Sequence, residues 1–108
     1  MYKYYLEVES PEHLLSCFEL AKLYGIYTSK DKPHARFVSR LLKEYCNHLG
    51  IEERLHYKTK EGLMAVWPAY IYKPLLDKLI KDYPTNELVE MEFSNKSHYF
   101  TIKREEVL

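Results

Sequence analysis

The chain has few cysteines, few glycines and no long apolar run. Its 108 residues include two cysteines, Cys17 and Cys46, and three glycines. Two cysteines are too few for a disulfide scaffold, and no apolar run approaches the ~20 residues that cross a bilayer. The first ten residues alternate polar and apolar side chains, so the apolar core of a secretory signal is absent. We therefore expect a cytoplasmic protein with reduced thiols and no membrane partner.

Net charge is absent as well, because sixteen Lys and Arg balance sixteen Asp and Glu. A neutral chain is not attracted as a whole to a polyanion, so binding of that kind must depend on local charge. The charge is unevenly distributed along the sequence. Residues 28–60 carry eight basic and four acidic side chains, a balance of +4, and the segments on either side carry −2 each. We expect a polarised surface.

The overall composition of the chain is typical of one folded domain covering residues 1–108. Hydrophobic residues make up 46% and charged residues 30% of the chain, which is the balance of a globular protein. Period-two and helical patterns follow one another in the order β-α-α-β-β-α-β-β. This order predicts an α+β fold, with a mainly antiparallel sheet and helices packed on one face. It approximates a ferredoxin-like fold with an added helix and strand.

Three amphipathic segments predict the helices. The first runs from Pro11 to about Tyr24 with Ser10 as its N-cap, the second covers 34–50, and the third covers 72–84,. Strands are expected at 2–9, 54–60, 63–67, 88–93 and 98–104. The side chains expected in the core are Leu14, Leu15, Phe18, Ala21, Phe37, Val38, Leu41, Leu42, Tyr45, Leu49, Leu75, Leu76, Leu79, Ile80, Tyr83, Val89, Met91, Phe93, Phe100 and Ile102.

The basic segment holds the candidate binding residues. Arg36, Arg40 and Lys43 recur at helical spacing opposite much of the apolar stripe of the second helix,. In the hairpin arm that follows, basic residues alternate with core-facing ones and should form an exposed polar face. The candidate residues are Arg36, Arg40, Lys43, Arg54, His56, Tyr57, Lys58 and Lys60. Such cations could meet phosphates and Tyr57 could stack on a base, or they could form an ordinary solvated face.

Patterns for catalysis or metal binding are weak, so we expect no catalytic residue, metal or cofactor. Cys46 and His48 point roughly 200° apart on a helix and cannot easily reach one ion. The two cysteines fit buried structural positions. Glu7 and Glu9 share one strand face and Glu90 and Glu92 share another, where they form the ordinary polar side of outer strands,.

One local resemblance points toward an enzyme. "FVSRLLKEYCNHLGI", a hairpin and then "YKPLLDKLIKDYP" resemble the helix–hairpin–helix half of a LAGLIDADG homing endonuclease domain over about half of the chain. The resemblance implies a metal-bearing acid before a glycine in the family's defining helix. Gly25 in "LAKLYGIYTS" has no such acid, so the activity is not carried over.

Three functions remain as hypotheses. The leading one is a small non-enzymatic protein that docks on a protein or nucleoprotein partner, for example a regulator or inhibitor such as an anti-defence protein of a phage or mobile element. The alternative is a nucleic-acid-binding module that uses the basic 34–60 surface for DNA or RNA. The second alternative is a small metal-dependent nuclease. The sequence does not determine the partner or the oligomeric state.

Overall fold

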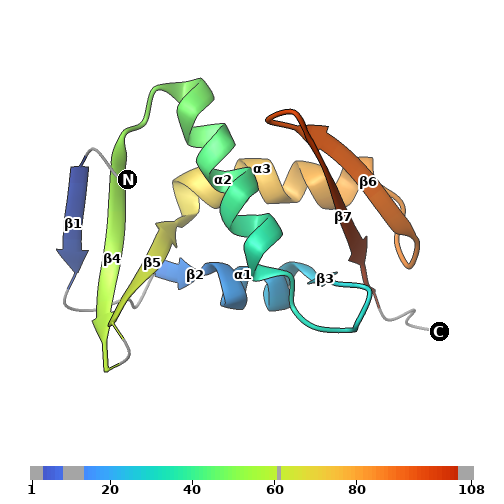
Figure 1. The fold of residues 1–108 in the computed structure, drawn as a ribbon, viewed down its shortest axis with the longest axis horizontal. Coiled ribbons are helices and arrows are strands. Elements are labelled where there is room, and N and C mark those ends of the chain that lie inside the picture. Colours follow the sequence, from blue (N-terminus) through green and yellow to red (C-terminus); the bar gives the residue numbers. More distant parts are fainter. Residues whose placement is uncertain (1–3, 9–13, 61, 105–108) are drawn as a thin grey trace.

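The computed structural model describes residues 4–8, 14–60 and 62–104, and it places three helices between two small β-sheets (Figure 1). The first sheet contains β1 (Tyr4–Val8), β4 (Glu53–Thr59), β5 (Gly62–Pro68) and β2 (Leu14–Ser16) in that spatial order. The second contains β3 (Ile26–Tyr27), β7 (Lys96–Ile102) and β6 (Leu88–Phe93). The helices are α1 (Cys17–Tyr24), α2 (Ala35–Leu49) and α3 (Ala69–Asp82).

The α+β class is confirmed, whereas the arrangement of the strands differs from the expected single sheet. The predicted strands divide between two sheets that lie on opposite sides of α2 (Figure 1). Two short strands, β2 and β3, are added to the expected order. All pairings are antiparallel except that of β1 with β4. The ferredoxin-like variant, which needs one continuous sheet, is therefore not confirmed.

The start of α1 shows why one expected helix is shorter. Ser16 is the N-cap, because the Glu19 backbone N–H donates to Ser16 Oγ at 3.2 Å and the Ser16 N–H donates to Glu19 Oε1 at 3.1 Å. This capping box fixes the first helical residue at Cys17. Leu15 instead pairs with Trp67 in the first sheet, and Phe18 is 52% exposed rather than buried. The expected start at Ser10 and Pro11 lies outside the described residues.

The second helix follows the prediction closely. It ends at Gly50, whose φ of +71° gives the left-handed cap that glycine adopts without strain,. α3 begins earlier than expected, at Ala69, so Pro74 lies inside the helix rather than in its first turn. The helices in the described ranges are either too short or too polar to cross a lipid bilayer.

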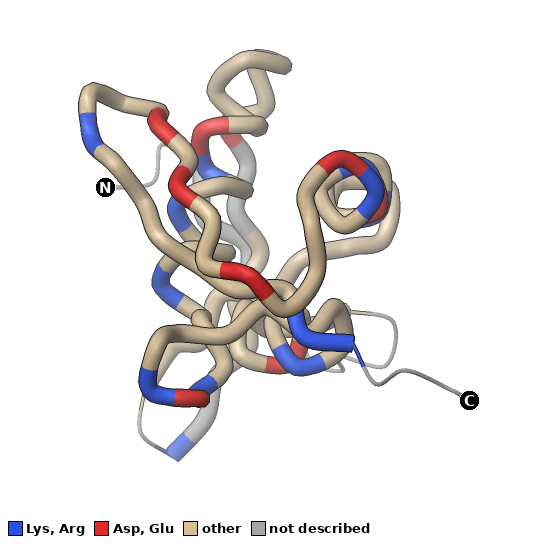
Figure 2. Tube along the Cα trace, turned by 90° about the vertical axis from the view of Figure 1, so that its right-hand side faces the viewer, with Lys and Arg blue, Asp and Glu red and all other residues tan. Residues whose placement is uncertain are grey.

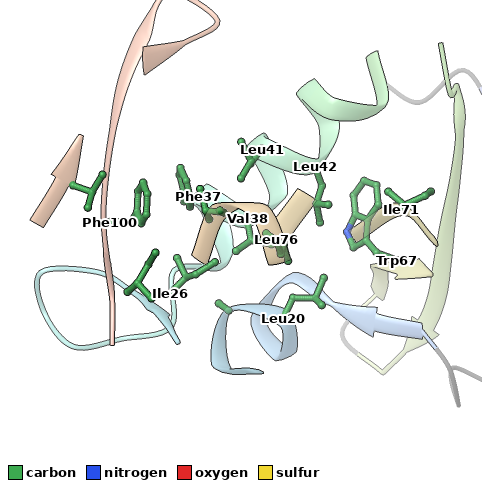
Figure 3. Close-up of a cluster of buried hydrophobic side chains, with 14 of the residues drawn as sticks. Leu20, Ile26, Phe37, Val38, Leu41, Leu42, Trp67, Ile71, Leu76 and Phe100 are labelled. Carbon is green, nitrogen blue, oxygen red and sulfur yellow. The ribbon is translucent and has the colours of Figure 1, made fainter. Parts of the chain in front are cut away.

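A single apolar cluster connects the helices to both sheets (Figure 3). Phe37 of α2 stacks on Phe100 of β7, with ring centroids 4.4 Å apart, and Trp67 of β5 closes the other end. The four leucines expected at its centre, Leu41, Leu42, Leu76 and Leu79, are all buried. Because each buried leucine removes its apolar surface from water, it stabilises the fold by roughly 1.5–3 kcal/mol. The helical spacing therefore identified these four core residues, whereas Leu49, also expected in the core, is 55% exposed.

Candidate binding face along helix α2

Helix α2 presents one face to the core and the opposite face to solvent. Phe37, Val38 and Leu42 are buried on the inner face. Arg36 and Arg40, which lie one turn apart, are exposed on the outer face,. The two arginines expected to share an outer surface therefore do so.

Three hollows adjoin this outer face. The central hollow has a volume of about 520 Å³, the loop hollow about 500 Å³ and the hairpin hollow about 270 Å³. Arg36 lines both the central and the loop hollow, and Arg40 lines both the central and the hairpin hollow. The central hollow is lined by Ser16, Cys17, Phe18, Ala35, Arg36, Ser39, Arg40, Lys43, Met64 and Ala65, the loop hollow by Thr28, Ser29, Lys30, Lys32, Pro33, His34, Ala35 and Arg36, and the hairpin hollow by Arg40, Phe93, Ser94, Lys96 and His98.

The lining of these hollows is positively charged throughout. It contains six Lys and Arg, and no Asp or Glu is among the described residues that line it. We call the six the basic face: Lys30, Lys32, Arg36, Arg40, Lys43 and Lys96. The side chains of Arg36, Arg40 and Lys96 form no ion pair with any residue in the part of the chain that the structure describes. Their charge is therefore available to a partner.

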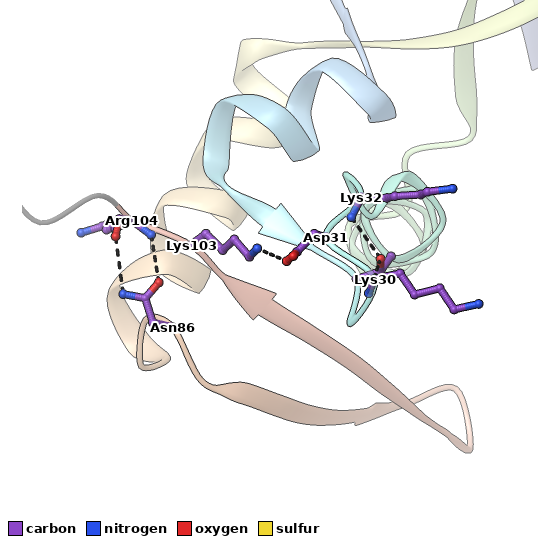
Figure 4. Close-up of polar contacts among 7 residues, drawn as sticks. Lys30, Asp31, Lys32, Asn86, Lys103 and Arg104 are labelled. Atoms are coloured by element: carbon purple, nitrogen blue, oxygen red, sulfur yellow. Dashed lines mark hydrogen bonds and ion pairs between the residues drawn. The ribbon is translucent and has the colours of Figure 1, made fainter.

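The loop before α2 directs its one acidic residue away from the basic face. Asp31 is bonded to Lys103 Nζ at the end of β7, whereas the side chains of Lys30 and Lys32 extend in other directions (Figure 4). The loop is held by Thr28, whose Oγ1 accepts from the backbone N–H groups of Lys30 at 3.2 Å and Lys32 at 3.3 Å. The loop hollow thus keeps two lysines without the opposing carboxylate.

The acidic residue of helix α2, Glu44, lies beside the hairpin hollow, where it is bonded to one of the lining residues. The hydroxyl of Ser94, in the β6–β7 turn, donates to Glu44 Oε2 at 2.7 Å, and His48 Nε2 lies 3.9 Å from Glu44 Oε1. Other acids lie on another side of the molecule, since Glu90 and Glu92 are exposed on β6. Figure 2 shows Lys and Arg along the side that carries α2 and acidic positions along the strand that faces the viewer. The polarised surface expected from the sequence is present.

The hairpin hollow combines cations with aromatic rings. Phe93 and His98 stack with centroids 3.9 Å apart and an interplanar angle of 11°. His98 is 7% exposed, and its Nε2 has no hydrogen-bond partner among the described residues. Because a buried polar atom without a partner costs free energy, it is a position where a ligand group can bind favourably. Arg40 and Lys96 line the same hollow.

His34 ties the N-terminus of α2 to the second sheet. As N-cap, its Nδ1 accepts from the Phe37 backbone N–H at 3.4 Å. Burial lowers the pKa of His34 below its ordinary 6.5, and the nearby charges of Arg36, His98 and Arg40 act in the same direction. A hydrogen bond to the backbone of Tyr99 opposes this shift in pKa. The neutral imidazole is therefore favoured, which is the form that can accept at Nδ1.

Cys17 lines the central hollow but is not an activated nucleophile. The Trp67 indole N–H donates to its Sγ at 3.2 Å. Burial raises the pKa of the Cys17 thiol above 9.0, although the hydrogen bonds from Trp67 and Ser39 and the charge of Lys43 act in the opposite direction. A thiol that stays protonated at neutral pH is a poor nucleophile, so the structure supports a structural role.

Strand β4 does not expose all of the side chains that the sequence predicted to be exposed. His56, predicted to be exposed, is buried at 5% exposure, whereas Lys60 is exposed as predicted. His56 pairs with Ala65, which lies two residues from the core Trp67 and so on the same side of the sheet,. Tyr57 is half-buried. Arg54 and Lys58 lie on β4, but their side chains fall outside the described part.

The structure therefore assembles only part of the candidate site. Arg36, Arg40 and Lys43 meet at the central hollow, where β5 contributes Met64 and Ala65. Lys60 lines none of the three hollows. The remaining cations come from elements that the site prediction did not include, with Lys30 and Lys32 from the loop before α2 and Lys96 from β7.

Sequence reasoning missed the hairpin hollow, although a signal for it was present. His98 alternates with Phe100 and Ile102, so it lies on the core-facing side of β7 together with Lys96,. A histidine and a lysine at alternate positions before the buried Phe100 and Ile102 indicate that the first half of this strand face lines a polar site and the second half lines the core.

A further cavity, of about 780 Å³, lies elsewhere, between α1, β3, α3 and the end of β7. Several of its polar groups are bonded to one another or to nearby residues. The Tyr24 hydroxyl donates to Asp77 at 3.0 Å, Lys103 bonds Asp31, and the Asn86 side chain exchanges hydrogen bonds with the backbone of Arg104 (Figure 4). None of its described lining residues comes from α2.

The described ranges do not bring the candidate metal ligands together. They contain no group of three or more His, Cys, Asp or Glu able to hold a metal ion. Cys46 is buried while His48 is exposed, as their spacing on α2 predicts. Glu7 lies on β1 in the first sheet and Glu90 on β6 in the second, at opposite ends of the molecule (Figure 1). The strands carrying these acids are not neighbours.

Comparison of the chain with protein-family models, with curated proteins and with solved structures finds no match. Function must therefore be inferred from the geometry of the site.

Proposed function

We propose that this is a non-enzymatic binding protein that docks its basic face on a macromolecular partner with a negative surface. One observation carries the proposal, namely that three adjoining hollows share six Lys and Arg and no carboxylate among their described lining residues. The whole chain is neutral. Charge of one sign has therefore been concentrated on one side, which speeds and orients association with an oppositely charged partner.

The two arginines of the basic face form no ion pair that holds the described part of the fold together. Arg36 and Arg40 are exposed and form no ion pair with the rest of the described chain, while the core beneath them is apolar. Exposed like charges one helical turn apart destabilise a helix slightly. A binding role accounts for their presence better than a structural one.

The metal-dependent nuclease receives less support. A metal-dependent nuclease needs a cluster of ligands, and the described residues offer none,. A regulator or inhibitor, such as an anti-defence protein of a phage or mobile element, would act through a docking surface of this kind, and that role stays a hypothesis drawn from composition.

The test is affinity capture with matched charge reversals. The wild type, Arg36→Glu with Arg40→Glu, and Lys78→Glu with Lys81→Glu are used as baits in a lysate of the source cells. Lys78 and Lys81 are exposed on α3 and line none of the three hollows, so the second pair changes the net charge equally. We expect the arginine pair alone to lose the partner. Retention of the same partner by the arginine pair would contradict the proposal.

A further inference from the structure

We infer that the partner of the basic face is a single strand of nucleic acid, whose phosphates follow Arg36 and Arg40 and one of whose bases enters the hairpin hollow. The inference rests on the proposed function and assigns a chemical class to the partner. Three features of the basic face support it.

The first feature is that the cations form a track rather than an isolated patch. Arg36 joins the loop hollow to the central hollow, and Arg40 joins the central hollow to the hairpin hollow. The two arginines are four residues apart, so they are separated by about 6 Å along the helix axis. A continuous row of cations with hollows between them suits a polymer that carries one negative charge per repeating unit.

The second feature is the helix N-terminus at one end of the track. α2 has 15 residues, and its first two, Ala35 and Arg36, line the loop hollow with Lys30 and Lys32. The N-cap His34 accepts from the Phe37 N–H and not from those of the first two residues. The positive end of the helix dipole thus adds to the two lysines at a position suited to a phosphate.

The third feature is the hairpin hollow, whose aromatic lining favours a nucleic acid over polyanions that have no bases. Arg40 and Lys96 supply charge, while the stacked Phe93 and His98 supply aromatic surface. Its volume of about 270 Å³ is close to the lower limit of small-ligand sites,. His98 also lines the hollow, and its buried Nε2 has no hydrogen-bond partner among the described residues, so it would bond the polar edge of a base once the ring turns toward the hollow,.

A single strand fits this arrangement better than a duplex. Unpaired bases can be turned out to stack on aromatic side chains, whereas the bases of a duplex are stacked on one another. An acidic protein segment would be attracted to the same cations, but its carboxylates are not attached to a flat ring that could enter the hairpin hollow beside them. Binding to such a segment is the competing result in the experiment below.

The experiment measures fluorescence anisotropy of labelled 12-residue probes with the full chain at several salt concentrations. The probes are mixed-sequence single-stranded DNA, the same sequence as RNA, the DNA duplex, and polyglutamate. We expect both single strands to bind at least tenfold more tightly than the duplex or polyglutamate at low salt. Affinity should fall steeply with salt, because bound phosphates release counterions.

Charge variants locate the phosphates. Arg36→Gln with Arg40→Gln should weaken single-strand binding at least tenfold at low salt and flatten the log–log salt dependence by about 1.4, as two lost contacts predict for a single strand. Lys78→Gln with Lys81→Gln on α3 is the matched control and should retain the wild-type affinity and slope within about twofold.

A ring variant locates the base. Phe93→Leu should lower single-strand affinity by roughly tenfold, within the range found for loss of one stacked base, with no change in the salt slope. Met91→Leu, on the same face of β6 and half-buried like Phe93, is its control and should bind as the wild type does. Thermal melts confirm that each variant is folded.

The results that overturn the inference differ from those that overturn the proposed function. Equal affinity for single strand, duplex and polyglutamate would overturn the inference, and so would absence of nucleic-acid binding at low salt. The proposed function would still stand if Arg36→Glu with Arg40→Glu abolished capture of a protein partner. Single-strand binding that survives the arginine variants unchanged would place the nucleic acid elsewhere and overturn the inference, whereas the proposed function is overturned only if the arginine pair still captures the same partner.

Discussion

Gly25 lies directly against the backbone of Lys103. The Lys103 N–H donates to the Gly25 carbonyl at 2.7 Å, and a Cβ atom at Gly25 would meet the Lys103 carbonyl oxygen at 2.4 Å. Gly25 has a φ of +71° at the C-terminus of α1. The close approach joins α1 to the end of β7 and leaves no room for a side chain.

We therefore expect Gly25→Ala to be strongly destabilising. Gly50 is the matched control, because it has the same φ and no atom within 4 Å of a Cβ at that position. Gly50→Ala should cost only the left-handed strain of about 1–2 kcal/mol. Gly25→Ala should cost ~2 kcal/mol more, since backbone must move. Urea unfolding measures both, and equal losses would mean that the Gly25–Lys103 contact is not as tight as described.

The buried leucines give a second prediction. Leu42 and Leu76 are 0% exposed, so replacing either by Ala should lower the free energy of unfolding by ~2–5 kcal/mol through loss of burial and formation of a cavity,. Leu49 lies on α2 as well but is 55% exposed. Leu49→Ala should change stability by less than ~0.5 kcal/mol. A Leu42→Ala loss as small as that of Leu49→Ala would show that α2 does not pack as the structure has it.

The N-cap histidine makes stability depend on pH. The pKa of His34 is lowered from 6.5 chiefly by burial, so below pH 6.5 the unfolded chain binds more protons than the folded one,. The stabilisation is complete above pH 6.5 and is lost as the pH falls through the folded-state pKa. His34→Asn keeps a side chain that can cap the helix and removes the titration. We expect its melting temperature to fall less than that of the wild type between pH 7 and pH 5.

A residue elsewhere on the same helix controls for the substitution itself. Asn47 is exposed near the C-terminus of α2 and carries no titratable group, so Asn47→Gln should keep the wild-type pH profile. If His34→Asn lost stability on acidification as steeply as the wild type, titration of His34 would not contribute.

Cys17 should react slowly with thiol reagents. Burial raises the pKa of its thiol above 9.0, and the thiolate is the reactive form. Alkylation of the folded protein at pH 7 should be at least tenfold slower than alkylation of free cysteine. Cys17→Ala and Cys46→Ala should each leave partner binding intact. Rapid modification of Cys17 at pH 7, with loss of binding in Cys17→Ala, would indicate a chemical role for that thiol.

How far the sequence predicts the fold depends on whether the deciding interaction is local. The apolar spacing and glycine cap of α2 are local, and the helix is found within a residue of its expected bounds. The start of α1 was also encoded locally, in the capping box that Ser16 and Glu19 form. The helix expected from Pro11 is therefore wrong over Leu14–Ser16, although the capping box that marks the true start is present in the sequence.

Other differences arise from contacts between distant residues. Leu14–Ser16 forms a strand because β5 is beside it, and no pattern within three residues can specify that pairing. The division into two sheets likewise depends on which strands find each other around α2. Helical spacing placed Arg36 and Arg40 on the outer face of α2, where both are exposed. Strand alternation gave the wrong face for His56, since both sides of that strand are at least partly covered.

The most direct test of the basic face as a binding site is a nuclear magnetic resonance titration of the isotope-labelled protein with a 12-residue single-stranded DNA at low salt. The account predicts that the largest shifts of backbone amides fall on residues 28–43 and 93–98, around the three hollows. It also predicts that the Phe93 and His98 ring signals move, while the amides of α3 around Lys78 and Lys81 remain in place. Shifts centred on α3, or on the acidic outer strand β6 with residues 28–43 unmoved, would contradict it.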